Sequence, residues 1–164
     1  MIIRLTEKLS KKLKTGPLTK IDTDPGPFLD WYAHLFSANR AQYILTTEAK
    51  SLLSIVMFGR GITDGDLFFR HWLSLMREYL ADTGNRFVFE RIIGPQTGLF
   101  IFSKTLSKSV LGSMNDMVNI SKTMLSIKDL SPWELSQMLN DTPFKAIEYQ
   151  RPLNAFSKTR LPSK

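Results

Sequence analysis

The middle of the chain carries one strongly periodic stretch, which limits the folds that the chain can adopt. From Thr63 to Leu80, large apolar side chains recur every three or four residues and fall on one broad face of a helix. These are Phe68, Phe69, Trp72, Leu73, Met76, Tyr79 and Leu80. Thr63 is the predicted N-cap of this helix, and Asp64 and Asp66 suit its positive end. A face this apolar must be buried against a second layer of structure.

Short apolar runs elsewhere in the chain supply that second layer, because their length and their β-branched residues are typical of strands. They lie near residues 1–6, 42–47, 51–58 and 98–103. Three residues separate the second run from the third, which predicts an antiparallel hairpin. We therefore predict an α+β fold in which a small, largely antiparallel sheet packs with about five helices.

Helical spacing and capping residues predict the remaining helices. They cover residues 7–13, 28–36, 86–93, 109–125 and a segment that starts at Ser131. The hydroxyl of Thr6 is expected to cap the first of them. Phe28, Trp31, Tyr32, Leu35 and Phe36 lie at helical spacing in the second. Ser131, Pro132 and Glu134 have the pattern of a capping box with proline at the first helical position.

The length and composition of the chain indicate one domain. It has 164 residues, of which 43% are hydrophobic, and no internal repeat. Residues 15–27 contain three prolines and two glycines, which predicts a loop. We expect residues 1–164 to form a single domain with a loose basic tail over about 157–164. No apolar run reaches the length of a membrane span and the N-terminus lacks a signal-peptide pattern, so we expect a cytoplasmic protein without a membrane partner.

The formal net charge of +7 is concentrated at the two ends of the chain. Residues 1–20 carry a net charge of +5 and residues 144–164 carry +4, so the region between them is slightly acidic. If the two ends meet in space, their field would attract phosphate backbones. Alternatively, the terminal lysines and arginines serve only to keep an exposed surface soluble.

Several classes of chemistry are excluded or disfavoured by the residues themselves. The chain has no cysteine, which rules out disulfides, thiolate metal ligands and cysteine nucleophiles. Its two histidines, His34 and His71, both fall on predicted helices among aromatic residues, where packing explains them better than catalysis. No zinc-protease, serine-hydrolase or phosphate-loop motif is present, and Gly59-x-Gly61 lacks the further residues of a nucleotide fingerprint. We expect neither a metal nor a cofactor.

The segment from Lys104 to Asp116 is the candidate ligand-binding segment, since it joins a predicted buried strand to the start of a helix. Free backbone amides, hydroxyls and lysines would meet there, which suits an anion. The candidate ligand-binding residues are Lys104, Lys108, Ser109, Gly112, Ser113, Asn115 and Asp116. Gly112 falls on the outward face of the helix, where it weakens the helix unless a partner approaches closely. The alternative is that Ser107 or Ser109 only caps the helix and that Gly112 relieves a crossing between two elements.

The same segment carries a family resemblance. Lys104-Thr105, followed by Ser109 to Asp116 with the sequence Ser-Val-Leu-Gly-Ser-Met-Asn-Asp, is similar to the signature of an uncharacterised family of small prokaryotic proteins, a domain of unknown function. Met1 to Leu9 and the Trp-Tyr-Ala-x-Leu segment at Trp31 to Leu35 also resemble this family, so the likeness covers nearly the whole chain. The resemblance implies an α+β fold and a bacterial or mobile-element origin, but no activity and no catalytic residues.

Three hypotheses about function follow. The first is a non-enzymatic binding or accessory domain whose partner is a protein or a nucleic acid. The second is a small enzyme or sensor for a phosphorylated or nucleotide ligand, in which Lys104 and Lys108 hold the anion and Asp116 is a base or metal ligand, with Ser109 or Ser113 nearby. The third is a homo-oligomer whose exposed helix is its own contact surface.

Overall fold

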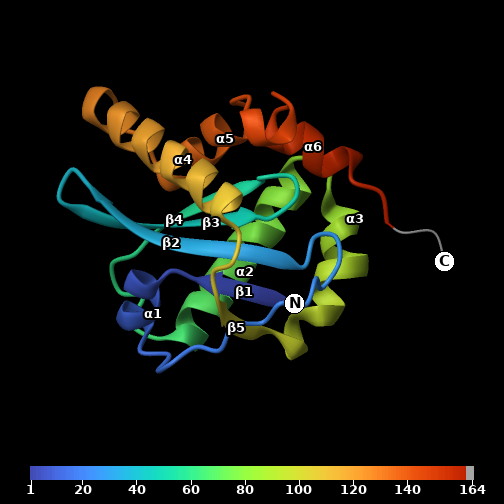
Figure 1. Cartoon of the computed structure of the whole chain (residues 1–164). Coiled ribbons are helices and arrows are strands. Elements are labelled where there is room, and N and C mark those ends of the chain that lie inside the picture. Colours follow the sequence, from blue (N-terminus) through green and yellow to red (C-terminus); the bar gives the residue numbers. More distant parts are fainter. Residues whose placement is uncertain (162–164) are drawn as a thin grey trace.

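A five-stranded sheet forms the central layer of the computed structural model, which describes residues 1–161 (Figure 1). The strands are β1 (Ile2–Leu5), β2 (Asp30–Ala38), β3 (Ala41–Glu48), β4 (Ser54–Phe58) and β5 (Ile101–Lys104). Their order across the sheet is β4-β3-β2-β1-β5. Helices pack on both faces, and the described residues contain six α-helices. The α+β class is therefore confirmed.

The prediction of a largely antiparallel sheet is wrong, because the sheet is mixed. β1 is parallel to both of its neighbours, β2 and β5, whereas β2, β3 and β4 form an antiparallel meander. The chain leaves β1 through α1 (Glu7–Leu13) and the long segment 14–29 before it enters β2. Such a crossover brings the chain back to the same end of the sheet, which makes the next strand parallel.

The predicted helix over residues 28–36 is wrong as well, because these residues enter strand β2. Trp31, Ala33 and Leu35 face one hydrophobic core, while Tyr32 and Phe36 face the other. A strand that is buried on both faces is apolar throughout, so its sequence does not alternate and resembles a short buried helix. This strand is the one missing from the predicted set, and His34 lies on it rather than on a helix.

A two-residue turn joins β2 to β3, so the two strands stay paired as far as Ala38 and Ala41. Asn39 and Arg40 have φ angles of 48° and 63°, as the tight hairpin turn with left-handed central residues requires. The hairpin between β3 and β4, by contrast, is the predicted one and is confirmed.

The periodic helix α2 (Gly65–Asp82) covers one face of the sheet together with α1. Its predicted apolar stripe is buried except for Leu73, which is partly buried, and Trp72 Nε1 donates to Thr46 Oγ1 on β3 at 2.8 Å. The N-cap is Asp64 and not Thr63, since the Asp64 side chain accepts from the backbone N–H of Leu67 at 2.8 Å. The hydroxyl of Thr6 makes no capping bond at α1, contrary to expectation.

The opposite face is covered by α4 (Lys108–Ile127) and α5 (Pro132–Asn140), which confirms both predicted helices and the capping box at Ser131. α5 also closes the outer edge of β4. Ser136 Oγ accepts from the backbone N–H of Val56, and the Asn140 side-chain amide bonds to both backbone groups of Ser54. At these positions the backbone groups of the edge strand are therefore not free to pair with a strand of another chain.

The remaining segments are short. They are α3 (Arg86–Val88), the π-helical turn η1 (Phe89–Ile93), the 3-10 turns η2 (Gly94–Leu99) and η3 (Lys145–Ile147), and α6 (Pro152–Lys158). Residues 86–93 are thus helical, as predicted, whereas the strand predicted over 98–103 begins only at Ile101. The predicted loose tail starts inside α6, and its last residues, 162–164, lie outside the described part of the chain.

The segment 14–29 contains neither helix nor strand, yet it is held closely to the sheet. Arg4 is the reason, because its guanidinium donates to both carboxylate oxygens of Asp30, at 2.7 and 3.3 Å, and to the carbonyls of Ile21 and Thr23. Ser103 on β5 bonds the same segment, accepting from the Ile21 N–H and donating to the Thr19 carbonyl, both at 3.1 Å. This predicted loop therefore covers β1 and β5 on the face where Arg4 lies.

Candidate functional site

The carboxyl ends of β1 and β5 meet at one edge of the sheet, and the chain leaves them toward opposite faces. After β1, α1 packs into the core beneath α2 through Leu9 and Leu13. After β5, α4 packs into the core on the other face through Val110 and Met114. In open sheets with parallel strands, such a divergence leaves a crevice outside the strand ends, where ligands commonly bind.

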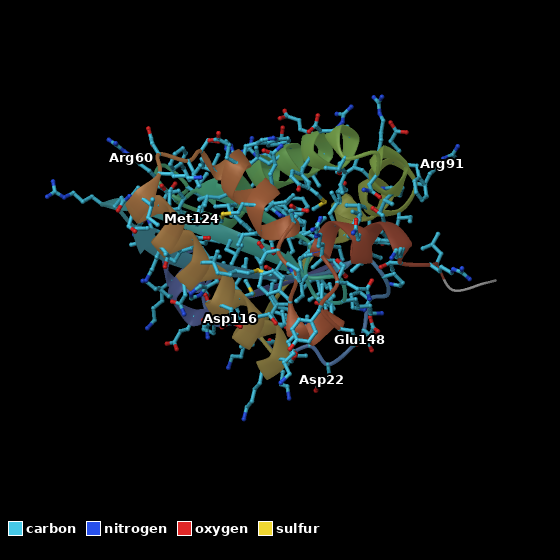
Figure 2. The ribbon with its side chains drawn as sticks, turned by 90° about the horizontal axis from the view of Figure 1, so that it is seen from above. Asp22, Arg60, Arg91, Asp116, Met124 and Glu148 are labelled. Atoms are coloured by element: carbon cyan, nitrogen blue, oxygen red, sulfur yellow. The ribbon has the colours of Figure 1, made fainter. Side chains whose placement is uncertain are left out.

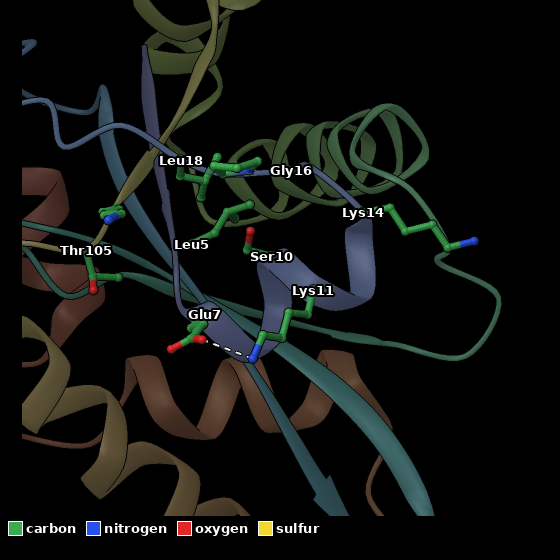
Figure 3. Close-up of a pocket in the computed structure, with 10 residues that line it drawn as sticks. Leu5, Glu7, Ser10, Lys11, Lys14, Gly16, Leu18 and Thr105 are labelled. Carbon is green, nitrogen blue, oxygen red and sulfur yellow. Dashed lines mark ion pairs between the residues drawn. The ribbon is translucent and has the colours of Figure 1, made fainter.

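A pocket of about 660 Å³ lies at this divergence (Figure 3). Leu5 and Leu18 are its apolar lining residues from β1 and from the segment 14–29. Its polar lining comes from Glu7, Ser10, Lys11 and Lys14 around α1 and from Lys104 and Thr105 at the end of β5. Three lysines thus surround an opening that contains one carboxylate.

A tight turn at the end of α1 shapes this pocket. Lys14 and Gly16 have φ angles of 55° and 73°, in the left-handed region that reverses the chain after the helix. The hydroxyls of Ser10 and Thr15 lie 2.6 Å apart and hold the turn against the helix. The chain then passes back over the pocket through Pro17 and Leu18. In Figure 3 the Lys14 side chain extends outward at the rim, away from Glu7.

The charges around the pocket are exposed. Lys11 Nζ lies 3.0 Å from Glu7 Oε1, and both side chains are more than three-quarters exposed, at 77% and 83%. The hydrogen bond and charge of Lys11, together with the charge of Lys104, hold the pKa of Glu7 below its usual value. Glu7 is therefore ionised at neutral pH, and its exposed ion pair with Lys11 is easily exchanged for another anion.

Of the predicted ligand-binding residues, Lys104 alone lines the pocket. Ser107 caps α4, since its side chain accepts from the backbone N–H of Val110 at 3.2 Å, as one alternative predicted. Its own N–H donates to the Tyr32 hydroxyl at 3.1 Å. Lys108 and Ser109 lie exposed in the first turn of α4.

The other predicted residues lie along α4 and do not converge with Lys104. Ser113 is buried against the sheet, whereas Gly112, Asn115 and Asp116 are exposed. In Figure 2 Asp116 is labelled on α4, which lies at the surface of the molecule. A Cβ added at Gly112 would meet nothing within 4 Å, so the prediction that this glycine relieves a crossing between two elements is wrong. Binding of a ligand by these α4 residues stays a prediction.

The model of a family described as a domain of unknown function, DUF6933, matches residues 2–155. The chain belongs to the DUF6933 family. This confirms the resemblance to a domain of unknown function, whereas the Ser-Val-Leu-Gly-Ser-Met-Asn-Asp signature and the prokaryotic origin remain predictions. No curated protein matches the chain.

A solved structure is similar to this DUF6933 domain in fold alone. It is a chain in the cryo-EM structure of the simian T-cell lymphotropic virus intasome in complex with the PP2A regulatory subunit B56 gamma. The TM-score is 0.53 at 12% sequence identity, and the match covers 90% of this chain. It covers 60% of the other chain, so the DUF6933 domain spans less than two thirds of that protein's length.

Within residues 1–161, the basic helix α1 of the DUF6933 chain does not meet the C-terminal helix α6. α1 follows the carboxyl end of β1, whereas α6 packs at the opposite end of the parallel strands, where the Phe156 ring lies 4.7 Å from that of Phe28, just before β2. The lysines of α1 are instead joined by Lys104, which the sequence places far away. Lys11, Lys14 and Thr105 are pocket residues that the sequence analysis did not select, although the lysine-rich first helix was a signal for them.

Metal sites and membrane-spanning helices are both absent from residues 1–161. This part of the chain contains no group of three or more histidine, aspartate or glutamate side chains that could hold a metal ion. None of its helices combines the length and the apolarity that crossing a membrane requires.

Proposed function

We propose that this protein is a non-enzymatic binding domain that holds a small phosphate-bearing molecule in the pocket between α1 and the ends of β1 and β5. The observation that carries the proposal is the pocket itself, about 660 Å³ in volume and lined by Lys11, Lys14 and Lys104. Its volume is within the usual range for small-molecule sites, and its place at the strand ends is a common one.

The lining residues match the two parts of such a ligand. Lys11 and Lys104 line the same pocket, and the charges of both lower the pKa of Glu7, so both cations are placed to attract a phosphate there. Ser10 and Thr105 add hydroxyl groups, and Leu5 and Leu18 offer apolar contact to an uncharged part. A mononucleotide combines these features.

Three observations favour binding over catalysis. Glu7, the carboxylate of the pocket, has a pKa below its usual value, which makes it a poor general acid or base near neutral pH. Ser10 bonds the Thr15 hydroxyl and not a general base. Asp116, the base of the enzymatic hypothesis, is exposed on α4 and does not line the pocket.

Titration calorimetry with pyrophosphate and with adenosine monophosphate tests this proposal. Lys104→Gln should weaken the binding of both ligands by about tenfold or more, because it removes a charge-assisted bond. Lys108→Gln is the matched control, since Lys108 is an exposed lysine four residues away that does not line the pocket. Equal losses in the two variants, or no binding by the unmodified protein, would refute the pocket as the site.

A further inference from the structure

A second pair of lysines lies beside the pocket, where β2 extends beyond the end of β1. β1 pairs with β2 only as far as Ala33, so the next residue, His34, lies past the end of the parallel pair. His34 is half-buried, and its Nδ1 lies 3.3 Å from the hydroxyl of Thr6, which directly follows β1. Its neighbours of the same strand face, Tyr32 and Phe36, pack in the core beneath α4. His34 therefore lies between the start of α1 and the body of α4.

Lys8 belongs to α1 and Lys122 to α4, the two helices between which His34 lies. Burial lowers the pKa of His34 below its usual value, and the charges of Lys8 and Lys122 lower it further. Both lysines are exposed, and neither makes an ion pair within the described residues. Two exposed cations on adjacent helices thus both act on the imidazole, and an anion between the two helices would offset their charge.

α1 connects this lysine pair to the pocket. Lys8 and Lys11 are three residues apart on the helix, which makes them neighbours on its surface, about 5–6 Å apart between Cβ atoms. Lys12, by contrast, points to the sheet, where it donates to the Gln42 side chain at 3.0 Å. One face of α1 thus carries both Lys11 of the pocket and Lys8, the lysine that acts on His34.

We infer that the molecule bound in the pocket is the phosphorylated end of a single-stranded polynucleotide, with its terminal phosphate held by Lys11 and Lys104 and a following backbone phosphate between Lys8 and Lys122. This inference rests on the proposed function. A mononucleotide can neutralise only one lysine pair, whereas a strand carries phosphates at regular intervals and engages both. Because these contacts are to phosphates, binding is independent of base sequence and weakens as salt is added.

Fluorescence anisotropy with a hexathymidylate labelled at its 3′ end tests the inference. We expect the 5′-phosphorylated hexamer to bind at least tenfold more tightly than the same hexamer without that phosphate, and than thymidine monophosphate measured by competition. Lys8→Gln/Lys122→Gln should weaken hexamer binding about tenfold, leave monophosphate binding unchanged, and reduce the logarithmic salt slope by about 0.7 for one lost phosphate. Lys145→Gln/Lys158→Gln removes the same charge from exposed positions elsewhere on the molecule. This control should change neither the affinity for the hexamer nor the salt slope.

Titration of His34 by NMR gives an independent readout. A phosphate between Lys8 and Lys122 adds negative charge beside the imidazole, so the hexamer should raise the pKa of His34 while the monophosphate leaves it unchanged. Equal affinity for hexamer and monophosphate, or an equal effect of the Lys8/Lys122 variant on both, would overturn the polynucleotide inference and leave the pocket proposal intact. Hexamer binding without dependence on the 5′ phosphate or on Lys104 would also overturn the polynucleotide inference, and the pocket proposal falls with it only if adenosine monophosphate binding is independent of Lys104 as well. Competition by hexaglutamate as effective as by unlabelled hexamer would overturn the assignment to nucleic acid.

Discussion

Arg4 and Lys104 are near neighbours on the paired strands β1 and β5, but Arg4 is buried and Lys104 is exposed. Arg4 lies opposite Ser103, and Lys104 lies opposite Leu5, one residue further along. Arg4 is 1% exposed, and its donors are taken by Asp30 and by the segment 14–29. Lys104 is exposed and lines the pocket. Successive side chains of a strand point to opposite faces, so a shift of one residue turns a structural cation into one that is free for a ligand.

The acidic residues repeat this contrast. Glu48 at the end of β3 is buried, and its pKa is raised by burial even though three donors from Lys50 and Ser51 bond one of its oxygens. Glu7 at the pocket is exposed, and its pKa is lowered by Lys11 and Lys104. Position in the fold, and not residue type, therefore decides whether a charge is buried within the fold or is available for binding.

Replacing Arg4 should have the largest effect on stability. Arg4→Met leaves the Asp30 carboxylate and two carbonyls without their donor, and we expect the free energy of unfolding to fall by about 3–5 kcal/mol in urea titrations. Arg151→Met is the control, because Arg151 pairs with Asp141 at 3.0 Å on the surface and should lose about 1 kcal/mol or less. Similar losses in the two variants would show that the buried pair does not anchor the segment 14–29.

Glu48→Gln should change the pH dependence of stability. The folded state raises the pKa of Glu48, so the folded protein binds the proton more tightly than the unfolded chain does. The resulting stability is fully present below the unfolded pKa and is lost as pH rises through the folded pKa. The wild type should therefore lose stability relative to Glu48→Gln between about pH 4.5 and that higher value, measured by urea unfolding at a series of pH values. A difference that does not vary with pH would contradict this.

Gly112→Ala should stabilise the protein, by about 0.5–1 kcal/mol, because Gly112 lies in an exposed helix where an added Cβ meets nothing. Thermal unfolding measures the gain. Gly65→Ala is the contrasting variant, since its Cβ would lie 2.7 Å from the Phe102 ring and should destabilise by about 1–3 kcal/mol. A stabilised Gly112→Ala that still binds pyrophosphate normally would separate the α4 surface from the pocket. Loss of pyrophosphate binding in Gly112→Ala would show that the α4 surface takes part in binding at the pocket.

Glu7→Gln should have the smallest effect. It removes the carboxylate that opposes an anion in the pocket and releases Lys11, so we expect the affinity for pyrophosphate to rise about twofold to fivefold. Calorimetry at low salt measures this gain, which should shrink as salt is added. Unchanged or weaker binding would mean that Glu7 orients Lys11 for the ligand rather than competing with it.

The local parts of the fold could be predicted because their signals lie within one helix or hairpin. The stripe of α2, the span of α4 and the capping box at Ser131 each depend on residues a few positions apart, and all three are confirmed. β2 could not be predicted in this way. Its apolar character comes from burial on both faces, which depends on helices that lie far away in the sequence.

The candidate site was predictable only in part. Lys104 was selected because a strand end that leads into a helix suits an anion. Its partners Lys11 and Lys14 join it only because β1 and β5 align in parallel about 100 residues apart, and because the turn at Gly16 folds the chain over the strand ends. The remaining residues of the predicted segment follow α4 away from the pocket.

The sequence by itself determined the α+β class, the apolar faces of the helices, the basic character of α1 and the absence of cysteine chemistry. These follow from side-chain periodicity and composition, which act over short distances along the chain. Tertiary structure alone decided the mixed sheet, the burial of Arg4 and the meeting of three lysines at one pocket. The physical reason is that strand pairing and burial are long-range, so the role of each charge depends on which segment covers it after the chain has folded.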